Sequence, residues 1–144
     1  MRTGGCQCGA VRFTIASDRL WAYACHCSQC QKQSASAFGL AVPVRREDFH
    51  VEGPTSYWSR PTFSGGRTDC HFCTDCGSRV FHAGSRGQIV TVKGGAFDEV
   101  GDLEPRAHLW TSMKLAWMVI PDGVEQYETQ PPDLSAWRAA AMST

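Results

Sequence analysis

The sequence lacks long apolar runs, a surplus of charge of either sign and, until its last residues, helical periodicity. No window approaches the about 18 apolar residues of a membrane-spanning helix, and the first residues contain no apolar export segment. Basic and acidic residues number 14 each and like charges do not cluster, which argues against nucleic acid and membrane surfaces as partners. We therefore expect a cytoplasmic protein whose ligand is a small neutral or polar molecule.

Internal repeats, low-complexity segments and a glycine-rich phosphate loop are also absent. The chain has 144 residues, of which 42% are hydrophobic, and this is enough apolar side chain for one core. We expect a single domain over residues 1–144, in which about residues 129–144 form a C-terminal tail.

Cysteine, in contrast, is abundant, with eight residues. Seven of them are grouped with the spacings C-x-C and C-x-x-C, which allow one tight turn to direct two sulfur atoms at a tetrahedral zinc ion. Because no export signal accompanies them, this grouping favours metal ligands in a reducing compartment over a disulfide scaffold.

Three of these cysteines, Cys25, Cys27 and Cys30, lie within six residues. Three sulfur ligands leave a tetrahedral zinc ion one ligand short, and an open fourth position is typical of a catalytic zinc site. His26 lies between two of them, and strand alternation directs its ring to the opposite side. We expect His26 to form a hydrogen bond near the metal or at the surface instead of binding the metal.

The other pairs are Cys6-x-Cys8 and Cys73-x-x-Cys76, the latter followed by Gly77 as in a zinc-knuckle turn. Together they supply the four thiolates of a closed site, although spacing alone does not fix this pairing. The eighth cysteine, Cys70, should point to the opposite face of its strand from Cys73. It is expected to be a small buried hydrophobe, and the alternative is a fourth ligand or redox-sensitive neighbour of the three-cysteine site.

Short alternating segments predict a mainly β protein. The segments predicted to be extended are 11–15, 20–24, 38–44, 48–51, 55–59, 78–82, 88–93, 94–98 and 107–110, and Cys70 is placed on a further extended strand that leads to Cys73. A short helix is predicted only at 133–142, where Asp133 is the capping residue. Residues 31–37 are small and polar, which suits either a pocket lining or a surface loop. Trp58, Trp110 and Trp117 are expected in the core, and the alternative is that they line a site.

In this order the motifs resemble the glutathione-dependent formaldehyde-activating (GFA) family, which also includes centromere protein V. The motifs that carry the resemblance are Gly5-Cys6-x-Cys8-Gly9, Cys25-His26-Cys27-x-x-Cys30, His71-Phe72-Cys73-x-x-Cys76-Gly77, Gly95-Ala96-Phe97-Asp98 and His108-Leu109-Trp110. The resemblance covers about residues 4–128 and implies a β-tent fold of stacked antiparallel sheets with two zinc ions per chain. It implies a structural zinc on Cys6, Cys8, Cys73 and Cys76, and a catalytic zinc on Cys25, Cys27 and Cys30.

The activity implied by the resemblance is that of a carbon-sulfur lyase similar to S-(hydroxymethyl)glutathione synthase. A thiol such as glutathione would take the open zinc position as a thiolate, add to formaldehyde and leave as the hydroxymethyl thioether, so that no protein nucleophile is needed. The alternative is a non-catalytic zinc-binding structural or interaction module. An enzyme predicts a solvent-reachable pocket at the three-cysteine zinc, whereas a module predicts a closed zinc and an exposed apolar patch elsewhere.

Overall fold

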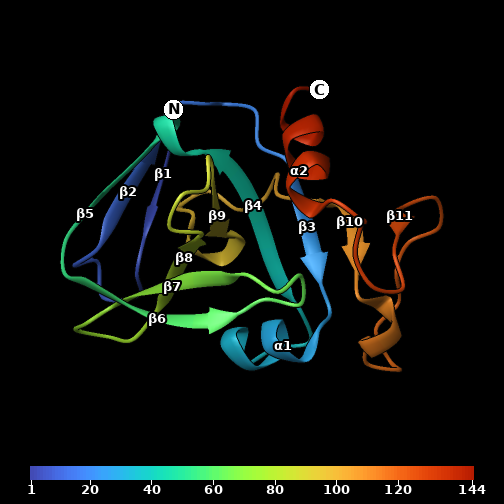
Figure 1. The fold of residues 1–144 in the computed structure, drawn as a ribbon. Helices are drawn as coiled ribbons and strands as arrows, with labels where there is room; N and C mark the ends of the chain where they lie inside the picture. The colour runs from blue at the N-terminus through green and yellow to red at the C-terminus, as the bar shows by residue number, and fades with distance from the viewer.

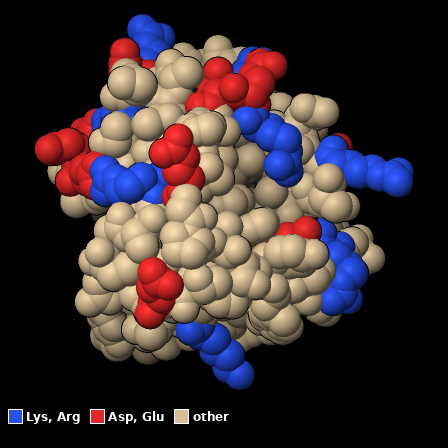
Figure 2. Space-filling model, turned by 90° about the vertical axis from the view of Figure 1, so that its left-hand side faces the viewer, with Lys and Arg blue, Asp and Glu red and all other residues tan.

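The computed structural model describes residues 1–144 and confirms a mainly β architecture built from two sheets. The smaller sheet has the strand order β1-β2-β5, and the larger one has the order β11-β10-β3-β4-β9-β8-β7-β6. Figure 1 shows the smaller sheet at the left of the molecule and the edge strands β10 and β11 at the right. No helix is both long and apolar enough to cross a membrane. Figure 2 shows basic and acidic side chains interspersed on one face of the molecule.

The elements agree with the predicted segments to within a few residues in most places. The strands are β1 (Arg2–Gly5), β2 (Arg12–Ile15), β3 (Ala22–Cys25), β4 (Gly39–Arg45), β5 (Phe49–Glu52), β6 (Thr55–Pro61), β7 (Arg67–Cys73), β8 (Arg79–Ala83), β9 (Ile89–Lys93), β10 (Pro105–Leu109) and β11 (Glu125–Gln126). The α-helices are α1 (Ser28–Ser34) and α2 (Leu134–Met142), and three short 3-10 helices lie at Arg46–Asp48, Gly94–Ala96 and Thr111–Met113.

The main core lies between the two sheets. Alternation in β2 turns Phe13 and Ile15 inward, where they are at most 1% exposed, and they pack with Val42, Val90 and other residues of the larger sheet. The ring of Phe13 meets the edge of Phe97 at 5.3 Å between centroids. Burial of this apolar face against the larger sheet is the main source of stability for such short strands.

One edge of the larger sheet departs from antiparallel pairing. Strand β10 runs parallel to β3 and also parallel to β11. The register places Leu109 opposite Cys25, and the backbone N–H of His26 donates to the carbonyl of Leu109 at 2.9 Å. Strand β10 therefore supports the segment that leads into the three-cysteine turn.

Several local predictions were wrong. Residues 28–34 form helix α1, where no helix was predicted, and Gly94–Ala96 is a 3-10 turn instead of an extended piece. Strand β1 was not predicted. Trp58 and Trp117 are 56% and 71% exposed, so they are not core residues, while Trp110 is half-buried.

The turn between β5 and β6 contacts the segments that carry both of the distant cysteine pairs. A Cβ atom added at Gly53, whose φ is +103°, would lie 2.1 Å from the carbonyl oxygen of Ala10, in the loop after Cys8. The carbonyl of the next residue, Pro54, accepts a hydrogen bond from the N–H of Thr74 at 3.0 Å. Gly53 thus allows an approach of two backbones that no residue with a side chain permits.

We expect Gly53→Ala to destabilise the protein much more than Gly65→Ala does. Gly65 also has a positive φ, +88°, but a Cβ atom there would meet nothing within 4 Å, so its substitution should cost only the left-handed strain of about 1 kcal/mol. Gly53→Ala adds a backbone clash to the same strain. Denaturant unfolding of both metal-loaded variants measures the difference, and equal losses would show that the turn is not tightly packed.

Candidate metal centres

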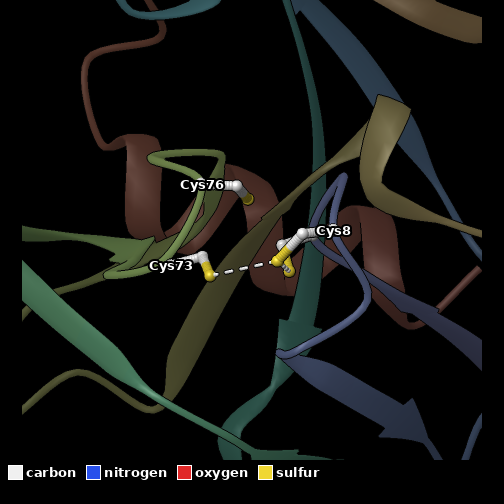
Figure 3. A group of neighbouring side chains, drawn as sticks. Cys8, Cys73 and Cys76 are labelled. Atoms are coloured by element: carbon white, nitrogen blue, oxygen red, sulfur yellow. Dashed lines mark hydrogen bonds between the residues drawn. The ribbon is translucent and has the colours of Figure 1, made fainter.

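The four-cysteine cluster, Cys6, Cys8, Cys73 and Cys76, lies where the β1–β2 hairpin meets the β7–β8 turn. Their four sulfur atoms all lie within 4.8 Å of one another, and Cys8 Sγ is 3.8 Å from Cys73 Sγ. A tetrahedron with metal–sulfur distances of ~2.3 Å has sulfur–sulfur edges of about 3.8 Å. Figure 3 shows Cys8 on one loop facing Cys73 and Cys76 on the other. This donor set fits zinc.

The β1–β2 hairpin forms its half of the cluster through backbone hydrogen bonds. The N–H of Cys6 donates to the carbonyl of Val11 at 3.1 Å, and the N–H of Gly9, whose φ is +82°, donates to the carbonyl of Cys6 at 3.1 Å. The N–H of Val11 also donates to Cys6 Sγ at 3.2 Å. A thiolate at Cys6 therefore already has a hydrogen-bond donor.

The β7–β8 turn is closed by glycine, as the sequence predicts. The N–H of Gly77, at φ +76°, donates to the carbonyl of Cys73 at 2.8 Å. Ser78 links the two halves, because its hydroxyl oxygen lies 3.2 Å from Cys76 Sγ and accepts from the N–H of Gln7 at 3.1 Å. The hydroxyl and N–H of Ser78 lower the pKa of Cys76 to about 6, which favours the thiolate that zinc requires.

The three-cysteine cluster is assembled at the junction of β3 and α1. Cys25 ends the strand, Cys27 caps the helix and Cys30 lies in its first turn, where its N–H donates to Cys27 Sγ at 3.4 Å. The sulfur atoms lie within 4.8 Å of one another, and the residues are 9%, 3% and 8% exposed. The group contains no fourth cysteine, histidine or carboxylate.

Electrostatics in this trio also fit a bound cation. Contacts with the thiols of Cys25 and Cys30 place the pKa of Cys27 far below its usual range, while contacts with Cys27 and Cys30 raise the pKa of Cys25 far above it. Three thiolates cannot share so small a volume without a compensating charge. A divalent ion supplies that charge and allows all three to ionise.

The structure gathers the predicted ligands into two groups and leaves His26 and Cys70 outside both. His26 is fully buried, not at the surface, and its Nε2 lies 2.8 Å from Nδ1 of His108. Burial, followed by the neighbouring His108, lowers the pKa of His26 to about 4, and burial also lowers the pKa of His108. Cys70 is fully buried, as expected of a small hydrophobe.

A cavity of about 70 Å³ lies against the three-cysteine cluster. It is lined by Tyr23, Cys25, Cys27, Cys30, Gly39, Ala41, Arg60, Phe63, His82, Lys93, Leu109, Trp110, Gln130 and Leu134. A cleft of about 960 Å³ shares Gly39 and Lys93 with it and also contacts residues 33–36. Of the two alternatives for the small polar segment, a pocket lining and a surface loop, the structure supports the first, because residues 33–36 line the cleft from the end of helix α1 and the residues that follow it.

Four basic residues near this cavity were not predicted from the sequence; they are Arg60, Arg79, His82 and Lys93. Burial lowers the pKa of Lys93 to about 8. Arg79 donates to Gln33 Oε1 at 3.1 Å, and Gln33 Nε2 donates to Cys30 Sγ at 3.3 Å. The sequence contained one indication of these basic residues, which is the lysine at the end of the mostly apolar strand β9. The other three residues belong to no motif.

Comparison with known proteins gives two findings. The family model described as "Glutathione-dependent formaldehyde-activating enzyme" matches residues 1–113, which include both cysteine clusters. Among solved structures, a crystal structure of a Rhodobacter sphaeroides protein is similar, with a TM-score of 0.54 and 22% sequence identity. The match covers 69% of this chain and 91% of that chain, and at this identity it supports the fold alone.

We expect the purified protein to contain two zinc ions per chain, and Cys73→Ser to unfold it. The four-cysteine site joins distant segments, and losing a structural zinc removes of order ~10 kcal/mol, comparable to the stability of a whole domain. Cys27→Ser should retain the fold and one zinc ion, because its cluster is local. Elemental analysis and circular dichroism measure both effects.

Cys70→Ala is the matched control for these variants, since Cys70 is buried but belongs to neither cluster. It should retain two zinc ions. Fewer than two zinc ions in wild-type protein purified without chelator, or loss of one in Cys70→Ala, would contradict the ligand assignment.

Proposed function

This chain belongs to the glutathione-dependent formaldehyde-activating enzyme family, and from that premise we propose that it is a zinc-dependent carbon-sulfur lyase similar to S-(hydroxymethyl)glutathione synthase. The observation that carries the proposal is the group of three sulfur atoms, without a fourth protein ligand, beside a cavity. A structural zinc would have a closed set of ligands.

The two clusters have different roles in this proposal. Cys6, Cys8, Cys73 and Cys76 would hold a structural zinc ion, and the trio of Cys25, Cys27 and Cys30 would hold a catalytic one. A zinc ion bound by three thiolates supplies an open position that binds a further thiol and lowers the pKa of that thiol. The protein itself supplies no nucleophile.

The reaction balances without an oxidant or reductant. The sulfur of the thiol forms a bond to the carbon of formaldehyde, and the π electrons of the carbonyl move to its oxygen. The proton lost by the thiol is balanced by one gained at the new hydroxyl group. The chain's part is to bind the thiol, orient it and exclude bulk water from a nearly buried sulfur cluster.

The sizes of the cavity and cleft suit this pair of substrates. A water molecule occupies about 30 Å³ of the liquid, so a cavity of about 70 Å³ admits a group of two or three heavy atoms. Formaldehyde is of that size. A tripeptide thiol such as glutathione does not fit there, and its bulk would lie in the adjoining cleft of about 960 Å³.

The second candidate is a non-catalytic zinc-binding interaction module. Two exposed apolar side chains favour it, Trp117 at 71% and Val119 at 80%, since exposed apolar residues close together are typical of protein contacts. Such a module requires neither a cavity at the second cluster nor turnover.

The two candidates differ in a measurable rate. We expect the zinc-loaded wild type to accelerate glutathione addition to formaldehyde above the spontaneous rate, and Cys25→Ser and Cys30→Ser to lose this acceleration while remaining folded. Exchange spectroscopy by NMR measures the rate at equilibrium, and Cys70→Ala is the control that should retain it. A folded wild type with two zinc ions that leaves the rate at background would remove the formaldehyde-glutathione assignment and leave the fold intact.

A further inference from the structure

Lys93, at the end of β9, lines both the cavity beside the three-cysteine cluster and the adjoining cleft. Gly39 is the one other residue that the two spaces share, and it has no side chain. The side chain of Lys93 therefore borders the junction of the two spaces. At this junction a small molecule in the cavity would meet a thiol that enters from the cleft.

The register of the larger sheet places Lys93 on the same face as the sulfur cluster. Ala41 of β4 is paired with Tyr23 of β3 on one side and with Lys93 on the other. Residues directly opposite each other share a face of the sheet, and Cys25, two positions after Tyr23, lies on that face too. Neighbouring strands are about 4.8 Å apart, so the backbone of Lys93 is about 10 Å from that of β3. Ala41 lines the cavity between them, and its small side chain leaves room for the lysine.

Lys93 has no carboxylate partner. It is half-buried, and no ion pair of the chain includes it. The cavity is lined by no acidic residue, and Asp98, the acidic residue of the cleft, is paired with Arg12. Lysine is seldom buried without a partner, and a lysine in such surroundings is typical of a functional site. The alternative role of Lys93 is to neutralise the thiolates of the cluster, and the experiment below separates the two roles.

We propose that Lys93 is a catalytic residue whose Nζ donates a hydrogen bond to the carbonyl oxygen of the aldehyde and then transfers that proton to it. This inference rests on the proposed function and names the source of the hydroxyl proton. As the sulfur–carbon bond forms, the π electron pair of the carbonyl moves to oxygen, and an N–H bond of the ammonium group breaks to form the hydroxyl. The amine then regains a proton from water in the cleft, which receives the proton of the thiol. Nothing is oxidised or reduced.

The two arginines near the junction do not meet the requirements of this role. Arg60 lines the cavity but not the cleft, and Arg79 lines the cleft but not the cavity. Arg60 also donates through Nη1 to the carbonyl of Pro61 at 3.2 Å. A guanidinium group keeps its proton in proteins, whereas an ammonium group can release one. Lys93 therefore has both the position and the chemistry of a proton donor.

The test is Lys93→Met, which removes the ammonium group and retains most of the length of the side chain. The variant should retain two zinc ions, and its dissociation constant for glutathione by isothermal titration calorimetry should change less than about threefold, since the lost contact forms in the transition state. Exchange spectroscopy by NMR should show the protein-dependent rate of glutathione addition to formaldehyde lowered about 100-fold, the lower end of what a positioned proton donor contributes. Lys32→Met is the matched control, because Lys32 is exposed on α1 and lines neither space, and it should retain the wild-type rate.

Each other outcome contradicts a different statement. An unchanged rate in folded Lys93→Met would overturn the role of Lys93 and leave the proposed function intact, whereas a wild type without acceleration would remove both. Weaker glutathione binding with an unchanged maximal rate would show that Lys93 binds the thiol and is not the proton donor. An equal loss of rate in Arg60→Gln would assign the effect to the positive charge of the cavity as a whole and overturn the proposal.

A second variant covers the case in which Lys93→Met unfolds or loses a zinc ion. Lys93→Arg keeps the positive charge that would neutralise the cluster, but its guanidinium group does not release a proton. It should therefore retain two zinc ions and still lose the acceleration. A rate near that of the wild type in Lys93→Arg would show that Lys93 serves only to neutralise the thiolates, and the proposal would be wrong.

Discussion

The approach of four cysteine sulfurs from two distant turns is the constraint on which this structure depends. Cys8 and Cys73 are 65 positions apart in the sequence, yet their sulfur atoms lie 3.8 Å apart. The N–H of Ala10 favours the thiolate of Cys8, but the thiols of Cys6 and Cys76 raise the pKa of Cys8 to about 12. Four ionised sulfurs therefore require a cation among them, and metal binding becomes part of the folding free energy. The smaller sheet is joined to the larger one at this point.

The two clusters use similar local spacings but differ in how far apart in the sequence their cysteines lie. The four-cysteine cluster closes a long loop, so its assembly carries a large loss of chain entropy and its ligands enforce the tertiary structure. The three-cysteine cluster is contained in residues 25–30, and the strand, turn and helix there are supported by β10 and by backbone hydrogen bonds. A change of ligand at the second cluster therefore need not disturb the fold. A site that binds and releases substrate must tolerate a change of ligand without unfolding, whereas a structural site need not.

Features encoded by neighbouring residues were predictable from the sequence. The pairs C-x-C and C-x-x-C, the positive φ of Gly77, the alternation of Phe13 and Ile15 and the Asp133 cap all depend on local geometry. Helix α1 was missed because its seven residues have no apolar period; its first turn is capped by the sulfur of Cys27, and Cys30 is its one buried residue. The parallel pairing of β10 with β3 was missed because it joins segments about 80 residues apart, for which no local pattern exists. The basic residues at the cavity were missed for the same reason, since Arg60, His82 and Lys93 meet only through the order of strands in the sheet.

The C-terminal segment, expected to be a tail, has a definite place at the second cluster. Trp137 of α2 packs against Trp21 and Tyr23 with ring centroids at 4.7 and 5.3 Å, and Arg138 donates to the Tyr23 hydroxyl at 3.0 Å. Gln130 and Leu134 line the cavity. These residues lie beyond residues 1–113, the part that matches the family model. The cysteines of both clusters thus lie in the part of the chain that matches the family model, whereas part of the cavity wall comes from a segment outside it. On the function proposed above, the residues that would hold the zinc ion and part of the wall that would contact the substrate therefore come from different parts of the chain.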